Sequence, residues 1–165
     1  MNGEKWTSLM AAVKETIEFI ISRPTLKNAI KITVICYGHR SRVVFKEENP
    51  SLDLIDKIVF GDGGTNFELA LTETYDRILE SKDKYESFAV GFLTDGEAEY
   101  PQKIIDKINA DADKIKQKIK FNCILFGSES SNLEMISKNL DGNYTNAINF
   151  EQLTKSFKEI INVAK

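Results

Sequence analysis

The sequence has a single histidine, two cysteines and three prolines. A Ser-His-Asp catalytic arrangement could only be built around His39, and no nucleophile motif accompanies that residue. His39 lies in a predicted turn between two strands, so we interpret it as a surface residue. Cys36 and Cys123 each lie within an apolar run, and we interpret them as small buried hydrophobic residues. The sequence therefore shows no histidine-dependent catalytic site.

Long apolar runs are also absent. No stretch reaches the roughly 18 uninterrupted apolar residues that a membrane span needs. Residues 1–5 lead into a charged amphipathic helix and not into the apolar core of a signal peptide. We therefore expect a cytoplasmic, intracellular protein with no membrane contact.

The sequence also has no large excess of positive or of negative charge. The formal net charge is -3 at pH 7, and the lysines and arginines are interspersed with acidic residues. Nucleic acid is thus not expected as a partner. A chain of 165 residues with 42% hydrophobic and 28% charged residues suits one domain with a sizeable core, so residues 1–165 are predicted to form a single domain.

Helix-like and strand-like patterns alternate along the chain. Amphipathic helices are expected at 6–21, 67–78, 101–115, 133–140 and 150–164, with a short helical stretch at 52–58. Buried strands are expected at 32–37, 88–93 and 121–126, an edge strand at 144–149, and a hairpin strand at 42–45. This order predicts the α/β class: a Rossmann-like three-layer α/β/α fold whose mainly parallel central sheet has one antiparallel strand.

Two loops with unusual polar content are expected at one edge of the sheet. In open parallel sheets, ligands gather outside the carboxyl ends of the strands. Residues 61–66 are glycine-rich and end in Thr65 and Asn66, and residues 94–97 place Asp95 directly after a buried strand. A hydroxyl and a carboxylate are hard oxygen donors, so this pair favours Mg²⁺ over a softer metal.

The same two loops resemble a known metal site. Gly63-Gly64-Thr65-Asn66-Phe67 before Ala70-Leu71, and Phe92-Leu93-Thr94-Asp95-Gly96-Glu97, resemble the second and third segments of the metal-ion-dependent adhesion site (MIDAS) of von Willebrand factor A (vWA) domains. The opening Gly3-Glu4-Lys5-Trp6-Thr7-Ser8-Leu9 resembles the helix that follows that family's first segment. The order of the later elements also matches, so the resemblance covers nearly the whole chain.

The resemblance implies a protein-protein interaction module. Thr65 would contact Mg²⁺ directly, Asp95 would bind it mainly through water, and an acidic side chain of a protein partner would complete the shell. The rim of the partner-binding face would be formed by Gly63, Gly64, Asn66, Gly96 and Glu97.

One departure from the family limits what the resemblance implies. Its first strand ends in Asp-x-Ser-x-Ser and supplies most of the metal ligands, and nothing before Met1 in this sequence provides it. The chain is therefore interpreted as an N-terminally truncated vWA-like domain with weak or absent Mg²⁺ binding. The family topology puts the missing strand between 32–37 and 88–93. We expect these two strands to close up, a partner chain to donate a strand, as in a strand-exchanged homodimer, or the sequence to be part of a longer protein.

Simpler interpretations stay open beside the metal site. Thr65 followed by Glu68 has the form of a helix capping box, and Asp95 can be a solvated turn residue. The whole chain can be a degenerate, metal-free scaffold domain within a larger intracellular complex.

A Rossmann-like nucleotide-binding enzyme is a weaker alternative. No lysine follows the glycines of 61–64, and no Gly-x-Gly-x-x-Gly follows the first strand. We therefore expect a protein that is not an enzyme.

Overall fold

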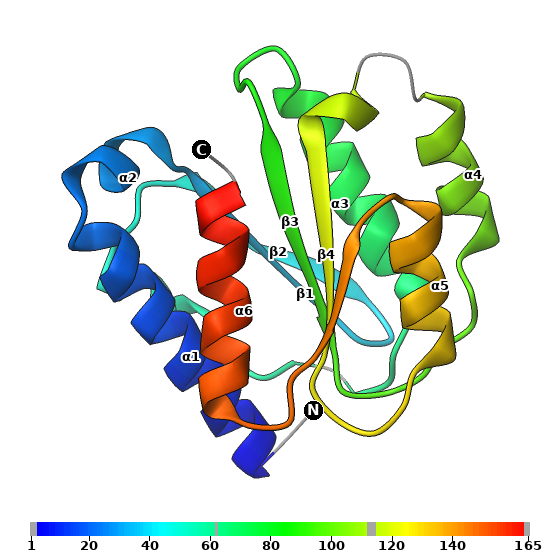
Figure 1. Ribbon diagram of the computed structural model, residues 1–165, viewed down its shortest axis with the longest axis horizontal. Coiled ribbons are helices and arrows are strands. Elements are labelled where there is room, and N and C mark those ends of the chain that lie inside the picture. The colour runs from blue at the N-terminus through cyan, green and yellow to red at the C-terminus, as the bar shows by residue number, and fades with distance from the viewer. Residues whose placement is uncertain (1–2, 62, 112–114, 164–165) are drawn as a thin grey trace.

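The structure, a computed structural model, alternates helices and strands as the sequence pattern predicts (Figure 1). It describes residues 3–61, 63–111 and 115–163. The helices are α1 (Gly3–Ile21), α2 (Pro24–Ala29), α3 (Phe67–Ser81), α4 (Gln102–Ala110), α5 (Ser131–Asn139) and α6 (Phe150–Val163), with short 3-10 helices at Leu52–Lys57 and Lys116–Lys118. The strands are β1 (Ile32–Tyr37), β2 (Ser41–Glu48), β3 (Phe88–Thr94), β4 (Ile119–Leu125) and β5 (Asn143–Asn146).

Two helices differ from the sequence prediction. α1 ends at Ile21 as expected, but a short helix that was not predicted, α2, begins at Pro24, because proline fits the first turn of a helix, where its missing N–H needs no partner. The helix expected over 101–115 ends at Ala110 in α4. Asp111 caps that end and accepts a hydrogen bond from the Tyr75 hydroxyl at 2.8 Å, while residues 112–114 lie outside the described residues.

The strands form two sheets. β3, β4 and β5 form a parallel sheet in that order, with Phe88 opposite Ile119 and Asn122 opposite Asn143. β1 and β2 form a separate antiparallel pair joined by a tight hairpin. The mixed α/β class, the parallel sheet and the antiparallel hairpin strand predicted from the sequence are therefore confirmed. The expected closing up of β1 against β3 is wrong, because the two strands belong to different sheets.

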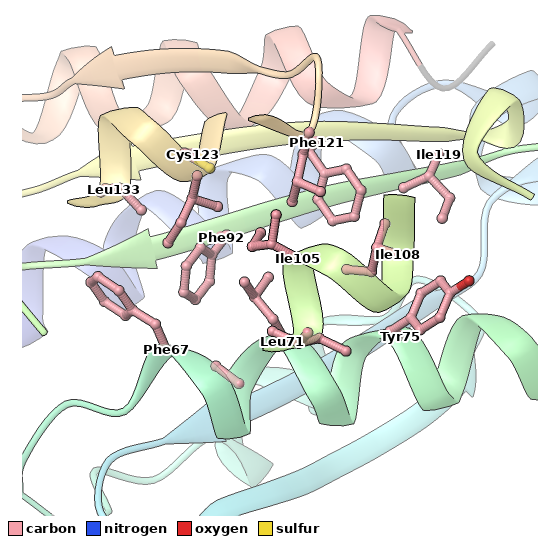
Figure 2. Packing of buried hydrophobic residues seen from close by; sticks show 14 of the residues in the cluster. Phe67, Leu71, Tyr75, Phe92, Ile105, Ile108, Ile119, Phe121, Cys123 and Leu133 are labelled. Atoms are coloured by element: carbon pink, nitrogen blue, oxygen red, sulfur yellow. The ribbon is translucent and has the colours of Figure 1, made fainter. Parts of the chain in front are cut away.

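Helices cover both faces of the strands (Figure 1). On one face, α3, α4 and α5 pack against β3 and β4 through the largest hydrophobic cluster, part of which is shown in Figure 2. On the other face, α1 and α6 pack through a second cluster that includes Ala12, Leu153 and Ile160. Cys123 is buried in the first cluster, which raises the pKa of its thiol to about 12, and both cysteines are free. The result is the three-layer arrangement expected from the sequence.

Helix α1 contacts both sheets. Its residues Leu9 and Ala12 pack in the cluster of β3, β4 and α6. An adjacent face of α1 packs in a third cluster with β1, β2 and the first 3-10 helix, through Trp6, Met10 and Val13. No helix in the described part of the chain is long and apolar enough to cross a lipid bilayer.

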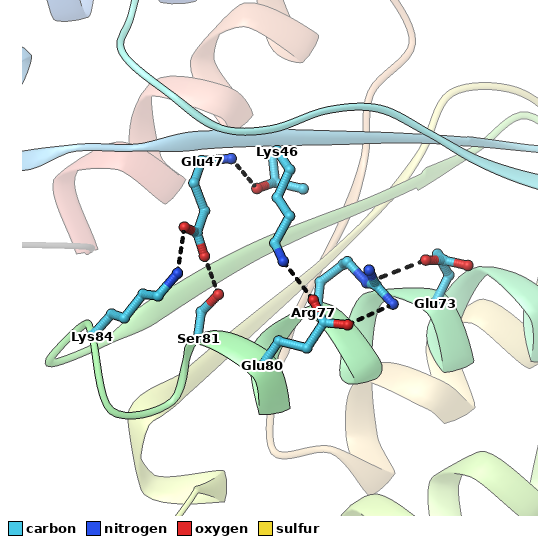
Figure 3. Close-up of polar contacts among 8 residues, drawn as sticks. Lys46, Glu47, Glu73, Arg77, Glu80, Ser81 and Lys84 are labelled. Carbon is cyan, nitrogen blue, oxygen red and sulfur yellow. Dashed lines mark hydrogen bonds and ion pairs between the residues drawn. The ribbon is translucent and has the colours of Figure 1, made fainter.

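Polar contacts fix the hairpin to α3 (Figure 3). The Glu47 carboxylate at the end of β2 accepts hydrogen bonds from the Ser81 hydroxyl and from Lys84. Lys46 pairs with Glu80, which also pairs with Arg77 at 3.0 Å. The hydrogen bonds from Ser81 and Lys84 lower the pKa of Glu47, so its carboxylate stays ionised at neutral pH. The hairpin therefore has a defined position relative to α3.

The core can be tested at Leu125, which is fully buried at the end of β4. Leu125→Ala should lower the free energy of unfolding by about 2–5 kcal/mol, because the lost methyl groups leave a cavity. Ile148→Ala is the matched control, since the Ile148 side chain is 72% exposed. Urea denaturation of both variants should show a large loss for the first and a loss below about 0.5 kcal/mol for the second. Equal losses would contradict the assignment of this core.

Candidate functional site

The carboxyl ends of β1 and β3 are tied by a tyrosine. The Tyr37 hydroxyl donates a hydrogen bond to the Leu93 carbonyl at 2.9 Å. The Tyr37 ring also lies 5.6 Å from the Phe92 ring. Burial raises the pKa of the Tyr37 hydroxyl, and the nearby charge of Asp95 raises it further, so the hydroxyl remains a donor at any physiological pH. The loop after β1 and the loop after β3 therefore begin next to each other at one edge of the molecule.

The glycine-rich loop is held at the same edge through His39. The backbone N–H of His39 donates to the Gly63 carbonyl at 2.9 Å. Gly64 has a φ of 83°, and a Cβ at that position would lie 2.6 Å from the His39 ring. Glycine is therefore required at position 64 both for the backbone conformation and for the close approach of the imidazole.

The start of α3 corrects one sequence-based interpretation. The residue that caps the helix is Asn66, whose side chain accepts a hydrogen bond from the Leu69 N–H at 3.0 Å. Thr65 precedes the cap, so the capping box proposed for Thr65 and Glu68 is wrong by one residue. Asn and Thr are both good N-caps, and the sequence could not decide between neighbours. The Thr65 hydroxyl is thus not explained by capping.

The structure brings the loops of Thr65 and Asp95 to one edge. Phe67, two residues after Thr65, packs edge-to-face on Phe92 with 5.4 Å between ring centroids. Asp95 follows β3 directly and lies close enough to Tyr37 to influence its hydroxyl. The rim residues Gly63, Gly64, Asn66, Gly96 and Glu97 lie in these same two loops.

The donor set of this edge is small. Thr65 and Asp95 are both half-buried and carry oxygen atoms, the donor type that Mg²⁺ prefers. Within residues 3–61, 63–111 and 115–163, no group of three or more His, Cys, Asp or Glu side chains is arranged to hold a metal ion. The residues present therefore have suitable chemistry for Mg²⁺ but can supply only part of an octahedral shell.

The loop after β3 is fixed by its neighbours. The Thr94 hydroxyl bonds both the N–H and the carbonyl of Gly96, which closes a tight turn around Asp95. Gly127 packs against this turn so closely that a Cβ there would lie 2.4 Å from the Asp95 carbonyl oxygen. The backbone of Asp95 is therefore positioned by contacts on both sides.

Glu97 bonds to the start of α5. Its carboxylate accepts hydrogen bonds from the hydroxyls of Ser130 and Ser131 and from the Asn132 N–H, at 3.1, 3.3 and 3.4 Å. Ser130 is also the N-cap of α5 and accepts from the Leu133 N–H. Desolvation raises the pKa of Glu97, but these hydrogen bonds and one from the Ala98 N–H outweigh it and lower the pKa below its usual range.

Sequence reasoning gave no role to Tyr37 or His39. Tyr37 is the last residue of β1 and His39 lies in the turn that follows, at the end of a strand that the sequence placed in the mainly parallel sheet, where ligand sites gather. Their place at the end of a predicted strand was therefore the feature of the sequence that could have predicted their contacts with the two loops.

Solved structures with the same architecture are vWA domains. Proximal thread matrix protein 1 from the mussel byssus superposes with a TM-score of 0.71 and 19% identity over 99% of this chain and 43% of its own. A von Willebrand factor type A protein from Catenulispora acidiphila gives 0.68 and 20% over 94% and 38%. The mussel protein with a zinc-occupied MIDAS motif gives 0.69 and 18% over 99% and 43%.

These likenesses identify the fold. This chain has the fold of a von Willebrand factor A domain, as the sequence resemblance implied. It spans less than half the length of each of these three structures. No protein-family model matches the sequence, and no curated protein matches it significantly.

The requirement for glycine at position 64 can be tested by a double-mutant cycle. Gly64→Ala should cost about 1–2 kcal/mol from the positive φ alone, with an added cost from contact with the His39 ring. In a chain that also carries His39→Ala, only the cost from the positive φ should remain. Urea denaturation of the unsubstituted chain, the two single variants and the double variant gives the free energy of unfolding of each. An identical cost of Gly64→Ala in both backgrounds would show that the imidazole does not press on this loop.

The role of Glu97 predicts a dependence of stability on pH. Because the pKa of Glu97 is lowered in the folded chain, its contribution is present above the carboxyl pKa of the unfolded chain and is lost as pH falls through the folded pKa. Glu97→Gln should lower the free energy of unfolding at pH 7 and have a smaller effect at pH 3, where the Glu97 carboxylate is protonated in both states. Glu99→Gln, which removes the same charge two residues away, is the control. Equal pH profiles for the two variants would disprove this coupling.

Proposed function

We propose that this chain is a non-enzymatic protein-protein interaction module of the vWA type, with a partial metal-ion-dependent adhesion site. The observation that carries the proposal is that the loops of Thr65 and Asp95 meet at one edge, through the contacts of Tyr37, His39 and Phe67. The vWA fold supports it, as does a neighbour of that fold whose MIDAS motif holds zinc.

The metal arrangement follows from the donors of this chain. The Thr65 hydroxyl would contact Mg²⁺ directly, and the Asp95 carboxylate would hold it mainly through water. Bound Mg²⁺ would supply a positive charge with open coordination positions at the binding face. Two protein donors leave most of the octahedral shell to water and to the partner, so Mg²⁺ affinity is weak until an acidic side chain of the partner joins the shell.

The proposed rim has two kinds of residue. Gly63, Gly64 and Gly96 have no side chains, so they leave the backbone open to close approach by a partner. Asn66 and Glu97 hold the starts of α3 and α5. Their side chains are thus engaged within the chain, and they would shape the rim more than they reach for a partner.

A metal-free scaffold domain within a larger complex is the second candidate function. It is favoured by the small donor set, because no acidic cluster of three accompanies Asp95 in the described residues. In that case the partner would bind the same fold without Mg²⁺. The two candidates differ in one measurable property, the response to the metal.

The metal role is tested by thermal unfolding with and without Mg²⁺. For a Kd of about 1 mM, about 10 mM Mg²⁺ should stabilise the chain by about 1.4 kcal/mol and raise Tm by roughly 3–5 °C. Thr65→Val and Asp95→Asn should each abolish the shift, whereas Asp56→Asn, an exposed carboxylate outside the site, should keep it.

The other outcomes separate the alternatives. No shift in the unsubstituted chain favours the metal-free scaffold. A shift that persists in Asp95→Asn would refute the assigned ligands. A shift with ATP but not with Mg²⁺ alone would favour the nucleotide-binding enzyme.

A further inference from the structure

The outer edge of β5 has no strand partner in the described part of the chain. β5 pairs with β4 along its inner edge, and the Ala147 N–H extends that pairing by donating to the Leu125 carbonyl. Backbone groups alternate direction along a strand, so those of Thr145 face β4 and those of Tyr144 and Asn146 point outward. Figure 1 shows β5, in orange, running in front of β4 between α5 and α6.

The composition of β5 permits pairing at its outer edge. The strand reads Asn-Tyr-Thr-Asn, with no charged residue, and its register with β4 has no bulge. The outer strand of the other sheet, β2, carries Arg42, Lys46 and two glutamates, and its register with β1 is shifted twice. Charged side chains and bulges are features by which proteins prevent pairing at a strand edge. Of these two outer edges, β5 is the one without such protection.

Helix α5 covers the edge on one face of the sheet. It packs against both β4 and β5, so its axis lies about half a strand spacing, roughly 2.4 Å, inside β5. A strand added beyond β5 by two-fold symmetry would lie about 4.8 Å away, which places α5 of a second copy about 10 Å from α5 of the first. Packed helices have interaxial distances of about 8–10 Å, so the two copies of α5 would be in contact.

The side of α5 that would meet a second copy carries one residue of each charge. Asn132 and Asn139, on the other side of the helix, bond to the segment just before α4. Glu134 and Lys138 are exposed and lie one turn apart on the side away from α4. Burial raises the pKa of the Tyr144 hydroxyl, and the charge of Glu134 raises it further, so Glu134 lies near β5.

We propose that the chain forms a two-fold homodimer in which β5 pairs antiparallel with β5 of a second copy, centred on Thr145. This register uses both outward residues of each strand, because Tyr144 of one copy exchanges backbone hydrogen bonds with Asn146 of the other. The two Thr145 side chains would lie opposite each other. The antiparallel α5 helices would place Glu134 of each copy beside Lys138 of the other. The parallel sheets of the two copies would join into one continuous sheet.

The charges of α5 select a second copy as the occupant. Glu134 lies in the first turn and Lys138 in the last turn, so an antiparallel copy of the helix brings opposite charges together at both ends. A separate extended peptide could pair with β5, but it would leave the outward side of α5 without a partner. α6 lies mainly over β3 and β4, so it leaves room for the second copy on the other face.

The dimer would also set the orientation of the candidate site. Because the β5 strands of the two copies run in opposite directions, the edges that carry Thr65 and Asp95 would face opposite ways. If these edges bind partners as proposed above, one dimer would join two partners. This consequence depends on the proposed function, whereas formation of the dimer does not.

The charge pairing is tested by two reversals and their mixture. Sedimentation velocity of the unsubstituted chain should show a concentration-dependent equilibrium between monomer and dimer. Glu134→Lys and Lys138→Glu should each raise the Kd of the dimer about tenfold, because like charges then face each other at both ends. A mixture of the two variants should form a mixed dimer with a Kd close to that of the unsubstituted chain, because opposite charges face each other again.

The control for these reversals is Lys103→Glu, which makes the same charge change on the exposed surface of α4 and should leave the Kd unchanged. A mixture of the Glu134 and Lys138 variants that associates as weakly as each variant alone would refute the antiparallel contact of α5.

The strand pairing is tested at the backbone. At high protein concentration, hydrogen-deuterium exchange should slow for the Tyr144 and Asn146 amides. The amides of Thr145 and Ala147 already face β4, so their exchange should not change. Asn146→Pro removes an outward N–H and keeps the pairing with β4, so it should abolish the dimer while the circular dichroism spectrum stays the same. A dimer that persists in this variant, or that protects neither outward amide, would use another surface and would overturn the proposal.

The register is tested by cross-linking. Residues opposite each other in a non-hydrogen-bonded antiparallel pair have Cα atoms about 4.5 Å apart, which is within reach of a disulfide. Mild oxidation of Thr145→Cys should therefore join two chains covalently. Asn143→Cys, on the same strand but away from the two-fold axis, and the unsubstituted chain with Cys36 and Cys123 are the controls. Equal cross-linking of the Thr145 and Asn143 variants would contradict the register.

Two further results would overturn the homodimer. If the chain stays monomeric and a synthetic extended peptide slows exchange of the Tyr144 and Asn146 amides, the occupant of the edge is a foreign strand. Loss of the dimer in EDTA would also refute pairing through β5, because that pairing uses no metal. An absent effect of Mg²⁺ on Tm, in contrast, would count against the proposed metal site alone.

Discussion

The hydrogen bond from Tyr37 to the Leu93 carbonyl is the contact on which the arrangement of the candidate site depends. In a continuous sheet, backbone hydrogen bonds would set the relative position of neighbouring strands. Here β1 and β3 lie in different sheets, so side chains and shared helices take over that role. The loops of His39 and Asp95 are attached to the two ends that Tyr37 connects. Together with the packing of Phe67 on Phe92, this hydrogen bond sets the position of the glycine-rich loop relative to the turn after β3.

Much of the fold could be predicted because its periodicities are strong. The run from Ile32 to Tyr37 is apolar and mostly β-branched, and α6 carries apolar residues at helical spacing, so both elements were predicted close to their bounds. The end of α4 was not, because Ile115 continues the helical spacing while a tertiary contact of Asp111 with Tyr75 occurs at the true end. A local pattern contains no information about such a partner.

The candidate site could be predicted only in part. Thr65 and Asp95 were selected because their loops were expected at the carboxyl edge of a parallel sheet and resemble two MIDAS segments, and their role as metal ligands stays a prediction. The capping residue of α3 was misassigned by one position, since Thr65 and Asn66 have similar capping ability and only the backbone conformation distinguishes them. The roles of Tyr37 and His39 depend on contacts across the sheets, which a single sequence does not encode in any local motif.

The hydrogen bonds of Glu97 connect the turn after β3 to the start of α5. Three of the bonds that Glu97 accepts come from the first residues of α5 and its cap. A ligand that displaces the turn must either break these bonds or move the beginning of the helix with it. The position of the turn that carries Asp95 is therefore coupled to the position of the start of α5.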